Sequence, residues 1–350
     1  MRRAVLVLSN LKRWRASTRA SLSPATPFLR RAGSRCLSTD SSSSSSPPPP
    51  PPPPSPPPPS VEASLQENER RIADLQAATR EALAAGRLGE ALEAARSARE
   101  HTLAFYGPRH AACAAAANNV ALVLKAQGGA ANLAAALELL EEAAQLYESL
   151  EGYGRAHVST ATAYANLGAL QLALARAAGG GLARVPHVEA GRGYLELALA
   201  SRRAALGERH AMVGVSLYQL ASAARMQRRF AEAEALLLEA VALLRACGAS
   251  ARASTATALN NLGFLLKETR EFARADAAYV EALAVRRELL GAAHPDSIAT
   301  QHNLAECRRA AGDEPGAVAL QQEILRLLGV ADDEGAEGSG AVQPQDARSI

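Results

Sequence analysis

The chain is poor in aromatic residues, which make up 4% of its 350 positions, and residues 62–330 contain almost no proline. Runs of alternating β-branched residues, which the strands of a sheet would need, are absent from this stretch as well. The stretch is rich instead in Ala, Leu, Glu and Arg, whose side chains lose little conformational entropy in a helix. The sequence therefore predicts an all-α fold.

Motifs of membrane insertion and of catalysis are also missing. No apolar run reaches the length of about 18 residues that a transmembrane helix needs. The chain has no glycine-rich nucleotide loop, no HExxH and no GxSxG motif, so we expect neither an enzyme nor a bound cofactor. The cysteines show no CxxC or other zinc spacing, so we expect no metal site. Three of them are expected on helices as small apolar residues: Cys113, Cys247 and Cys307.

Acidic residues are absent from residues 1–37, which hold nine of the 38 Lys and Arg residues. The remainder has 29 basic and 35 acidic residues, a net charge of −6, so we expect no binding to the phosphate backbone of nucleic acid. An arginine-rich start without acidic residues is typical of a mitochondrial transit peptide, and Arg35 fits a processing cut after Leu37. A chloroplast transit peptide is the alternative.

Two low-complexity segments flank the middle of the chain. Residues 38–61 are runs of Ser and Pro, which predict a disordered linker with a stiff, extended polyproline part. A ligand for an SH3 or WW domain is the alternative for this segment. Residues 331–350 are small, acidic and polar, which predicts a disordered tail.

Residues 62–330 contain an internal repeat, the most informative feature of the sequence. A loop that ends in histidine, or in its degenerate equivalent, is followed after nine residues by a helix core. Successive cores lie 47, 53, 42 and 42 residues apart, so the period is 42 with insertions of 5 and 11. The five core positions are Asn119, Asn166, Gln219, Asn261 and Asn303.

Each period is expected to form two helices. Apolar residues recur at intervals of three and four after the core position, and small residues in the second helix let the two helices approach closely. The small residues are Ala233, Ala240, Ala275 and Ala282, and Ala91 and Ala98 fit the same register in a first, divergent pair. The pattern predicts six helix pairs.

Residues 259–296 resemble the 42-residue tetratricopeptide (TPR) repeat of kinesin light chains. The shared features are LNNL, the paired alanines, Glu-Ala-Leu and the closing LG..HP, and the resemblance extends over about residues 68–328. It implies a right-handed TPR solenoid of about six antiparallel helix pairs over residues 62–330, with the first helices lining a concave groove. The chain lacks the long heptad coiled coil of kinesin light chains, which argues against an adaptor of a motor.

The resemblance also implies which residues contact a partner. In the family, the asparagine of the core points into the groove and bonds the backbone of a peptide. Carried over, the groove residues are Asn119, Asn166, Gln219, Asn261 and Asn303. The alternative is that these amides bond a neighbouring helix. A column of small residues is expected to leave room for the ligand beside them: Ala116, Ala163, Ser216, Ala258 and Thr300.

Three further features of the repeat region are a basic column, a set of repeated histidines and an insertion. The column six residues after the core is mostly basic, and it either clamps an acidic partner or complements the helix dipoles, which its place near the helix ends favours. Its members are Lys125, Leu172, Arg225, Lys267 and Arg309. The repeated histidines are expected in loops or at helix starts, as structural residues: His110, His157, His210 and His294. The insertion at residues 178–192 is expected to lengthen one loop and to be flexible.

The function expected from these features is that of a non-enzymatic scaffold or adaptor that binds a peptide or a partner protein in the groove, inside mitochondria. A narrower alternative is an assembly factor for a respiratory complex. An alternative of another class is an organellar RNA-binding helical-repeat protein. That class predicts a period of 35 residues and basic inner columns, whereas this chain has a period of 42 and an acidic balance.

Overall fold

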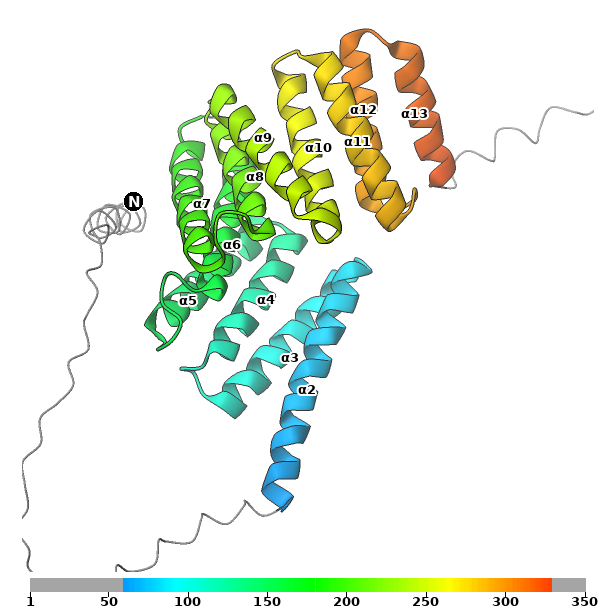
Figure 1. Ribbon diagram of the computed structural model, residues 1–350. Coiled ribbons are helices and arrows are strands. Elements are labelled where there is room, and N and C mark those ends of the chain that lie inside the picture. The colour runs from blue at the N-terminus through cyan, green and yellow to red at the C-terminus, as the bar shows by residue number, and fades with distance from the viewer. Residues whose placement is uncertain (1–58, 180, 329–350) are drawn as a thin grey trace, which may run out of the picture. The chain divides into compact units, whose positions relative to one another are not determined.

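The computed structural model describes residues 59–179 and 181–328 (Figure 1). These residues form twelve α-helices and one short 3-10 helix and include no strand, which confirms the all-α prediction. The expected leader, most of the linker and the acidic tail lie outside the described residues. The chain divides into two compact units between Gly107 and Pro108.

Unit 1 contributes one hairpin, made of α2 (Pro59–Ala84) and α3 (Leu88–Tyr106). Its helices pack through small residues, since Ala91 and Ala98 are buried as the repeat register predicts. Thr102 is also fully buried, and its hydroxyl donates a 2.7 Å hydrogen bond to the backbone oxygen of Ala98. The one polar atom of this side chain thus has a hydrogen-bond partner within its own helix.

Unit 2 contributes five hairpins, which follow one another along the chain (Figure 1). Their first helices are α4 (Ala111–Gln127), α6 (Val158–Ala177), α8 (Ala211–Met226), α10 (Arg252–Glu268) and α12 (Pro295–Ala311). Their second helices are α5 (Ala130–Ser149), α7 (Arg184–Leu206), α9 (Phe230–Ala246), α11 (Phe272–Leu290) and α13 (Glu314–Leu327). The short helix η1 (Gly248–Ala251) precedes α10. With the hairpin of unit 1, these are the six helix pairs that the 42-residue period predicts.

The four repeated histidines are the N-cap residues of first helices. In each, the ring nitrogen Nδ1 accepts a hydrogen bond from the backbone N–H two residues later, as His210 does from Met212 at 3.1 Å. The same bond begins α4, α6 and α12, at His110, His157 and His294. A helix start leaves backbone N–H groups without partners inside the helix, and the imidazole satisfies one of them. Their expected place at helix starts is confirmed.

The turn between the two helices of a hairpin needs a residue with positive φ. Gly86 has φ +73° in unit 1, and Gly312 has φ +90° between α12 and α13. The equivalent positions in the two preceding hairpins are Arg228 and Arg270, with φ of 60° and 65°. Glycine adopts this region readily, whereas a side chain makes it costly. Two arginines therefore occupy strained turn positions.

The first helices form one layer of unit 2. Each contacts the next first helix along the stack, from α4 to α12. From α6 to α12 each also packs against the second helices before and after it. Neighbouring second helices do not approach each other as closely. The first helices therefore form the more tightly spaced layer, and we call its exposed side the inner face.

Ion pairs between residues far apart in the sequence connect the more widely spaced second helices. In three consecutive steps an arginine of one second helix pairs with a glutamate 36 residues later, in the next second helix. The pairs are Arg203–Glu239, Arg245–Glu281 and Arg287–Glu323, with nitrogen–oxygen distances of 3.2, 2.5 and 2.9 Å. Both the arginines and the glutamates recur every 42 residues, so one interaction repeats along the stack.

The predicted small residues of the second helices lie in the core. Ala233, Ala240, Ala275 and Ala282 are fully buried. Two apolar clusters surround them, one around Leu195, Leu217 and Leu244 and the other around Leu265, Leu266 and Tyr279. Close approach also requires glycine, because a Cβ on Gly168 would lie 2.6 Å from Leu195 and 3.0 Å from the backbone oxygen of Gly191.

The insertion at residues 178–192 is helical over more than half of its length, which corrects the expectation of a long flexible loop. Helix α7 begins at Arg184, and only residues 178–183 separate it from α6. Buried Val188 and the close contact between Gly191 and Gly168 hold this segment against α6. Arg192 then pairs with Glu232 of α9 at 2.6 Å. The inserted residues thus extend a hairpin by adding buried contacts.

One cysteine also departs from its expected place. Cys113 and Cys307 are buried on helices α4 and α12, as predicted. Cys247 instead caps the C-terminus of α9, and its thiol lies 3.4 Å from the backbone oxygen of Arg209. The degenerate loop of this repeat is a turn of 3-10 helix, which begins directly after the cysteine.

Candidate functional site: the inner face of unit 2

The five predicted groove residues all lie on first helices and are partly buried, but they fall into two groups. Two of them bond the preceding first helix. The amide nitrogen of Asn166 donates to the side-chain oxygen of Asn118 at 2.7 Å, and that of Asn303 donates to Asn260 at 3.2 Å. For these two residues the alternative interpretation holds, because their amides bond a neighbouring helix.

The other three predicted residues make no side-chain hydrogen bond within residues 59–179 and 181–328. They are Asn119, Gln219 and Asn261. The side-chain oxygen of Gln219 is buried and without a partner among these residues. A buried amide oxygen without a hydrogen bond costs free energy, so it is a position at which a donor from a ligand would be stabilised.

The column of small residues does not line the groove, which corrects our prediction. Ala116, Ala163, Ser216, Ala258 and Thr300 are all buried. Two of them contact arginines of the preceding hairpin. Arg202 donates to Ser216 at 2.7 Å, and Arg286 donates to Thr300. Their small size therefore allows helices to pack and gives no room for a ligand.

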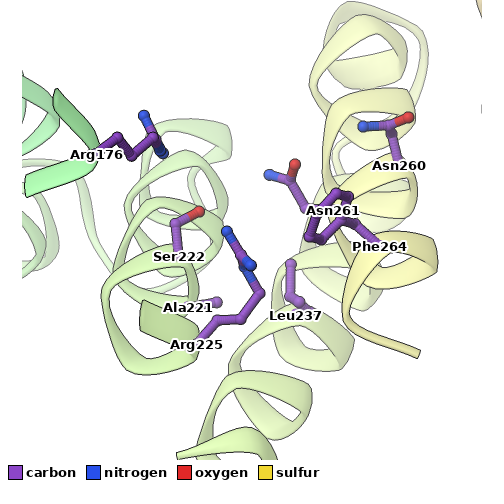
Figure 2. Close-up of a pocket in the computed structure, with 8 residues that line it drawn as sticks. All are labelled: Arg176, Ala221, Ser222, Arg225, Leu237, Asn260, Asn261 and Phe264. Atoms are coloured by element: carbon purple, nitrogen blue, oxygen red, sulfur yellow. The ribbon is translucent and has the colours of Figure 1, made fainter. Parts of the chain in front are cut away.

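Asn261 lines a pocket of about 130 Å³ on the inner face (Figure 2). Side chains from α6, α8, α9 and α10 surround this pocket. Figure 2 shows four polar groups turned toward one space, namely the guanidinium groups of Arg176 and Arg225, the hydroxyl of Ser222 and the amide of Asn261. The Ser222 hydroxyl donates to the backbone oxygen of Tyr218 at 3.2 Å, which leaves its oxygen able to accept.

Arg225 is held in place at the edge of this pocket. One of its guanidinium nitrogens lies 3.0 and 3.1 Å from the two carboxylate oxygens of Glu268. The guanidinium carbon also lies 4.6 Å from the ring centre of Phe264, over which Lys267 approaches from 5.3 Å. A guanidinium over an aromatic face is attracted by the ring and loses mobility. Arg225 therefore presents its remaining donors in a fixed orientation.

Arg176 has no such compensation. Among the described residues its guanidinium makes no ion pair and no hydrogen bond, and its charged neighbours are other cations. Burial lowers the pKa of the Arg176 guanidinium, and Arg225 and Arg184 lower it further. Burial likewise lowers the pKa of the Lys125 ammonium, and Arg176 adds to that effect. Cations from three first helices thus lie close enough to repel one another.

The basic column needs a partial correction as a result. Lys125, Arg225, Lys267 and Arg309 do lie in or next to the last turn of their helices, where a cation is favourable. On its own helix Arg225 points away from Gln219, but it meets Asn261 of the next first helix in one pocket. The spacing of residues within one helix does not predict this meeting of two residues from neighbouring repeats.

Arg176 was missed at the sequence level. The column position on α6 is Leu172, which is buried, and Arg176 lies four residues later, near the end of a longer helix. Arg176 therefore lies outside the column that the repeat register defines, two residues before the insertion. The sequence did contain a signal for it. Arg176 lies one helical turn after Leu172, the one apolar residue in an otherwise basic column.

Family models of the tetratricopeptide repeat match residues 213–249 and 254–328. The search of curated proteins gave no match. The solved structure of BtubC (BKLC) from P. vanneervenii is 22% identical over 81% of this chain and 96% of its own, with a TM-score of 0.51. The apo form of the quorum sensor NprR from B. thuringiensis is 12% identical over 77% of this chain and 68% of its own, with a TM-score of 0.50.

Kinesin light chain TPR-like repeats from Podosopora anserina are 20% identical to this chain, over 64% of it and 99% of the solved chain, with a TM-score of 0.48.

In the described part of the chain, no helix is both long enough and apolar enough to cross a membrane. The hairpins over residues 213–249 and 254–328 are therefore tetratricopeptide repeats, within an all-helical fold that BtubC and NprR share.

Proposed function

We propose that this protein is a non-enzymatic interaction scaffold that binds an extended segment of a partner protein along the inner face of unit 2. The observation that carries the proposal is the Asn261 amide, which is turned into a pocket and has no hydrogen-bond partner among the described residues. An amide offers both a donor and an acceptor, so it can bond the backbone of a peptide whatever the peptide's side chains.

The proposed binding set is smaller than the predicted one. Asn119, Gln219 and Asn261 are available for a ligand, whereas Asn166 and Asn303 are engaged between helices. Available and engaged amides alternate along the stack for most of its length. A peptide laid along the inner face would therefore be held at separate points about one or two hairpins apart.

We further propose that the protein acts in mitochondria, because residues 1–37 combine nine basic residues with no acidic ones. A chloroplast location is the alternative. The assembly of a respiratory complex is one process that such a scaffold would serve.

Proximity labelling tests the proposal. A biotin ligase is fused after Ile350, and labelled proteins are compared between the wild-type chain and the triple variant Asn119→Ala, Gln219→Ala, Asn261→Ala. The matched control is Gln322→Ala, which removes an exposed amide from α13. We expect the triple variant to lose a distinct set of mitochondrial partners that the control retains. Equal labelling by both variants would rule out the inner face as the binding surface.

A further inference from the structure

Arg176 is the feature of the pocket that peptide-backbone binding leaves unexplained. Many arginines of unit 2 pair with a carboxylate, as Arg245 does with Glu281 and Arg287 with Glu323. Arg176 has no carboxylate partner among the described residues, and its side chain is exposed at the pocket. Its nearest charged neighbours are the cations Arg225 and Arg184. Like charges held together in this way are stabilised by an anion between them.

The charge around the pocket is strongly unbalanced. Arg176, Arg225, Arg184 and Lys267 bring four positive charges, and Glu268 is the acidic residue paired with them. Arg225 uses one nitrogen for Glu268, so its other guanidinium nitrogens remain able to donate. The site therefore has both the charge and the donors to hold an added oxyanion.

The size and composition of the pocket fit a carboxylate. Two guanidinium groups, whose planar forks match the two oxygens of a carboxylate, face the space together with the Asn261 amide. A volume of about 130 Å³ is a few times that of a water molecule, so it holds a carboxylate with its methylene groups and excludes a large ligand.

The insertion that interrupts the repeat contributes to this arrangement. It begins directly after α6, which carries Arg176, and it adds the first residues of α7. Arg184, at the start of α7, donates a 3.1 Å hydrogen bond to the backbone oxygen of Met226, the last residue of α8. This bond fixes the inserted segment beside Arg225, the neighbour of Met226 in the chain. Arg184 thus comes from the inserted segment, and Arg176 lies two residues before it.

We propose that the partner segment is acidic and that one of its Asp or Glu side chains enters the pocket between Arg176 and Arg225, while Lys125 attracts a second acidic group. The inference rests on the proposed function, since it names the chemistry of the segment that the inner face binds. RNA is a poorer fit, because the ring of Phe264, the aromatic residue that lines the pocket, already has the cations Arg225 and Lys267 over it, where a base would have to stack.

A peptide library tests the inference on the full chain. Bead-displayed nonapeptides with random sequence and amidated C-termini are selected on the immobilised protein, so that only side chains can supply carboxylates. We expect the selected peptides to be enriched in Asp and Glu. Selection of peptides without acidic enrichment would overturn the acidic chemistry and leave peptide binding standing. Selection of no peptide at all would overturn the proposed function itself.

Fluorescence polarisation with a labelled peptide from that selection then tests the residue. We expect Arg176→Gln to weaken binding at least tenfold, because a charge-assisted hydrogen bond is lost. The same peptide with Gln for Glu should be weakened to a similar extent. Arg326→Gln is the matched control, since it removes one charge from an exposed position on α13. Far-ultraviolet circular dichroism checks the folding of both variants.

Three results would overturn the assignment. One is binding by Arg176→Gln within twofold of the wild-type and control values. Another is tighter binding of a phosphoserine version of the peptide by tenfold or more, which would assign the pocket to phosphate. The third is retention of a single-stranded RNA oligonucleotide at physiological salt that Arg176→Gln abolishes while the acidic peptide is not retained, which would assign the inner face to nucleic acid.

Discussion

The side-chain amide of Asn166 donates a 2.7 Å hydrogen bond to the side-chain oxygen of Asn118, across the contact between two neighbouring first helices. Asn303 and Asn260 repeat this bond two hairpins later. Asparagines at one repeat position therefore serve two purposes. Some connect hairpins, and others, such as Asn261, face the pocket.

Substitution of these asparagines should separate the two purposes. We expect Asn166→Ala to lower the free energy of unfolding by about 0.5–1.5 kcal/mol, because it removes one hydrogen bond between helices. Asn261→Ala should change it by less than about 0.5 kcal/mol, since no bond within the described chain is lost. Urea denaturation followed by circular dichroism measures both. If the double variant Asn118→Ala, Asn166→Ala shows additive losses, the two residues are not coupled.

Close packing of glycine gives a second prediction. Gly168→Ala should destabilise the protein by roughly 1–3 kcal/mol, because the new Cβ would lie 2.6 Å from Leu195 and 3.0 Å from the backbone of Gly191. Gly89→Ala on α3 is the matched control, since nothing lies within 4 Å of its Cβ position. There the change should be neutral or stabilising by up to about 1 kcal/mol. Thermal unfolding compares the two, and equal effects would contradict the close contact.

Replacement of a strained turn residue should stabilise the fold. Arg270 has φ 65° at the position where the next hairpin has Gly312 with φ 90°. We expect Arg270→Gly to raise the free energy of unfolding by about 0.5–1 kcal/mol, as the relief of strain exceeds the entropy that glycine adds to the unfolded chain. A rise in the melting temperature supports this expectation. A fall would show that Arg270 makes a stabilising contact that outweighs the strain.

The ion pair between Arg192 and Glu232 predicts a dependence on pH. The hydrogen bonds from Arg192 lower the pKa of the Glu232 carboxyl, and the charge of Arg192 adds to this effect. A lowered folded-state pKa means that the stabilisation is present above the unfolded value of about 4.3 and is lost as the pH falls through the folded value.

Glu232→Gln should therefore be less stable than wild type at pH 7, by at most about 1 kcal/mol for so exposed a pair. The difference should disappear in acid, below the folded-state pKa. Glu189→Gln, at an exposed position on α7, is the control and should show no such dependence. Urea midpoints at pH 7 and in acid measure the effect, and a difference that persists in acid would contradict the assignment.

Processing of the leader can be followed by fluorescence. Trp14 is the one tryptophan in the sequence, and it precedes the expected cut after Leu37. We expect protein purified from mitochondria to lack tryptophan emission and the unprocessed chain to show it. Emission from the purified mitochondrial protein would place the cut before Trp14 or show that no cut occurs.

Much of the fold could be predicted because the sequence repeats itself. The 42-residue period located the helix pairs, and the histidines identified the helix starts, where each side chain caps a helix. The ion-pair series was present in the same signal, since Arg203, Arg245 and Arg287 recur at that period. Arginines and glutamates are common on the exposed sides of helices, so the repeat of these residues does not by itself indicate that they pair.

The candidate site was harder to predict, because it forms between repeats. The column that includes Ser216 and Thr300 could be identified, but which way it faced depends on how one hairpin packs on the next. Arg176 lies outside the repeat register, near the end of a helix that directly precedes the insertion. Contacts of this kind depend on the relative positions of helices, so they produce no pattern of fixed spacing in the sequence.

The series of arginine–glutamate pairs has a consequence for how such a chain can change in length. Each pair spans 36 residues, and the pairs recur at 42, so deletion or duplication of a 42-residue block leaves every remaining arginine opposite a glutamate. Removal of residues 245–286, for example, would bring Arg287 into the place of Arg245. A gene duplication within this region would therefore lengthen the array without any compensating substitution in its ion pairs.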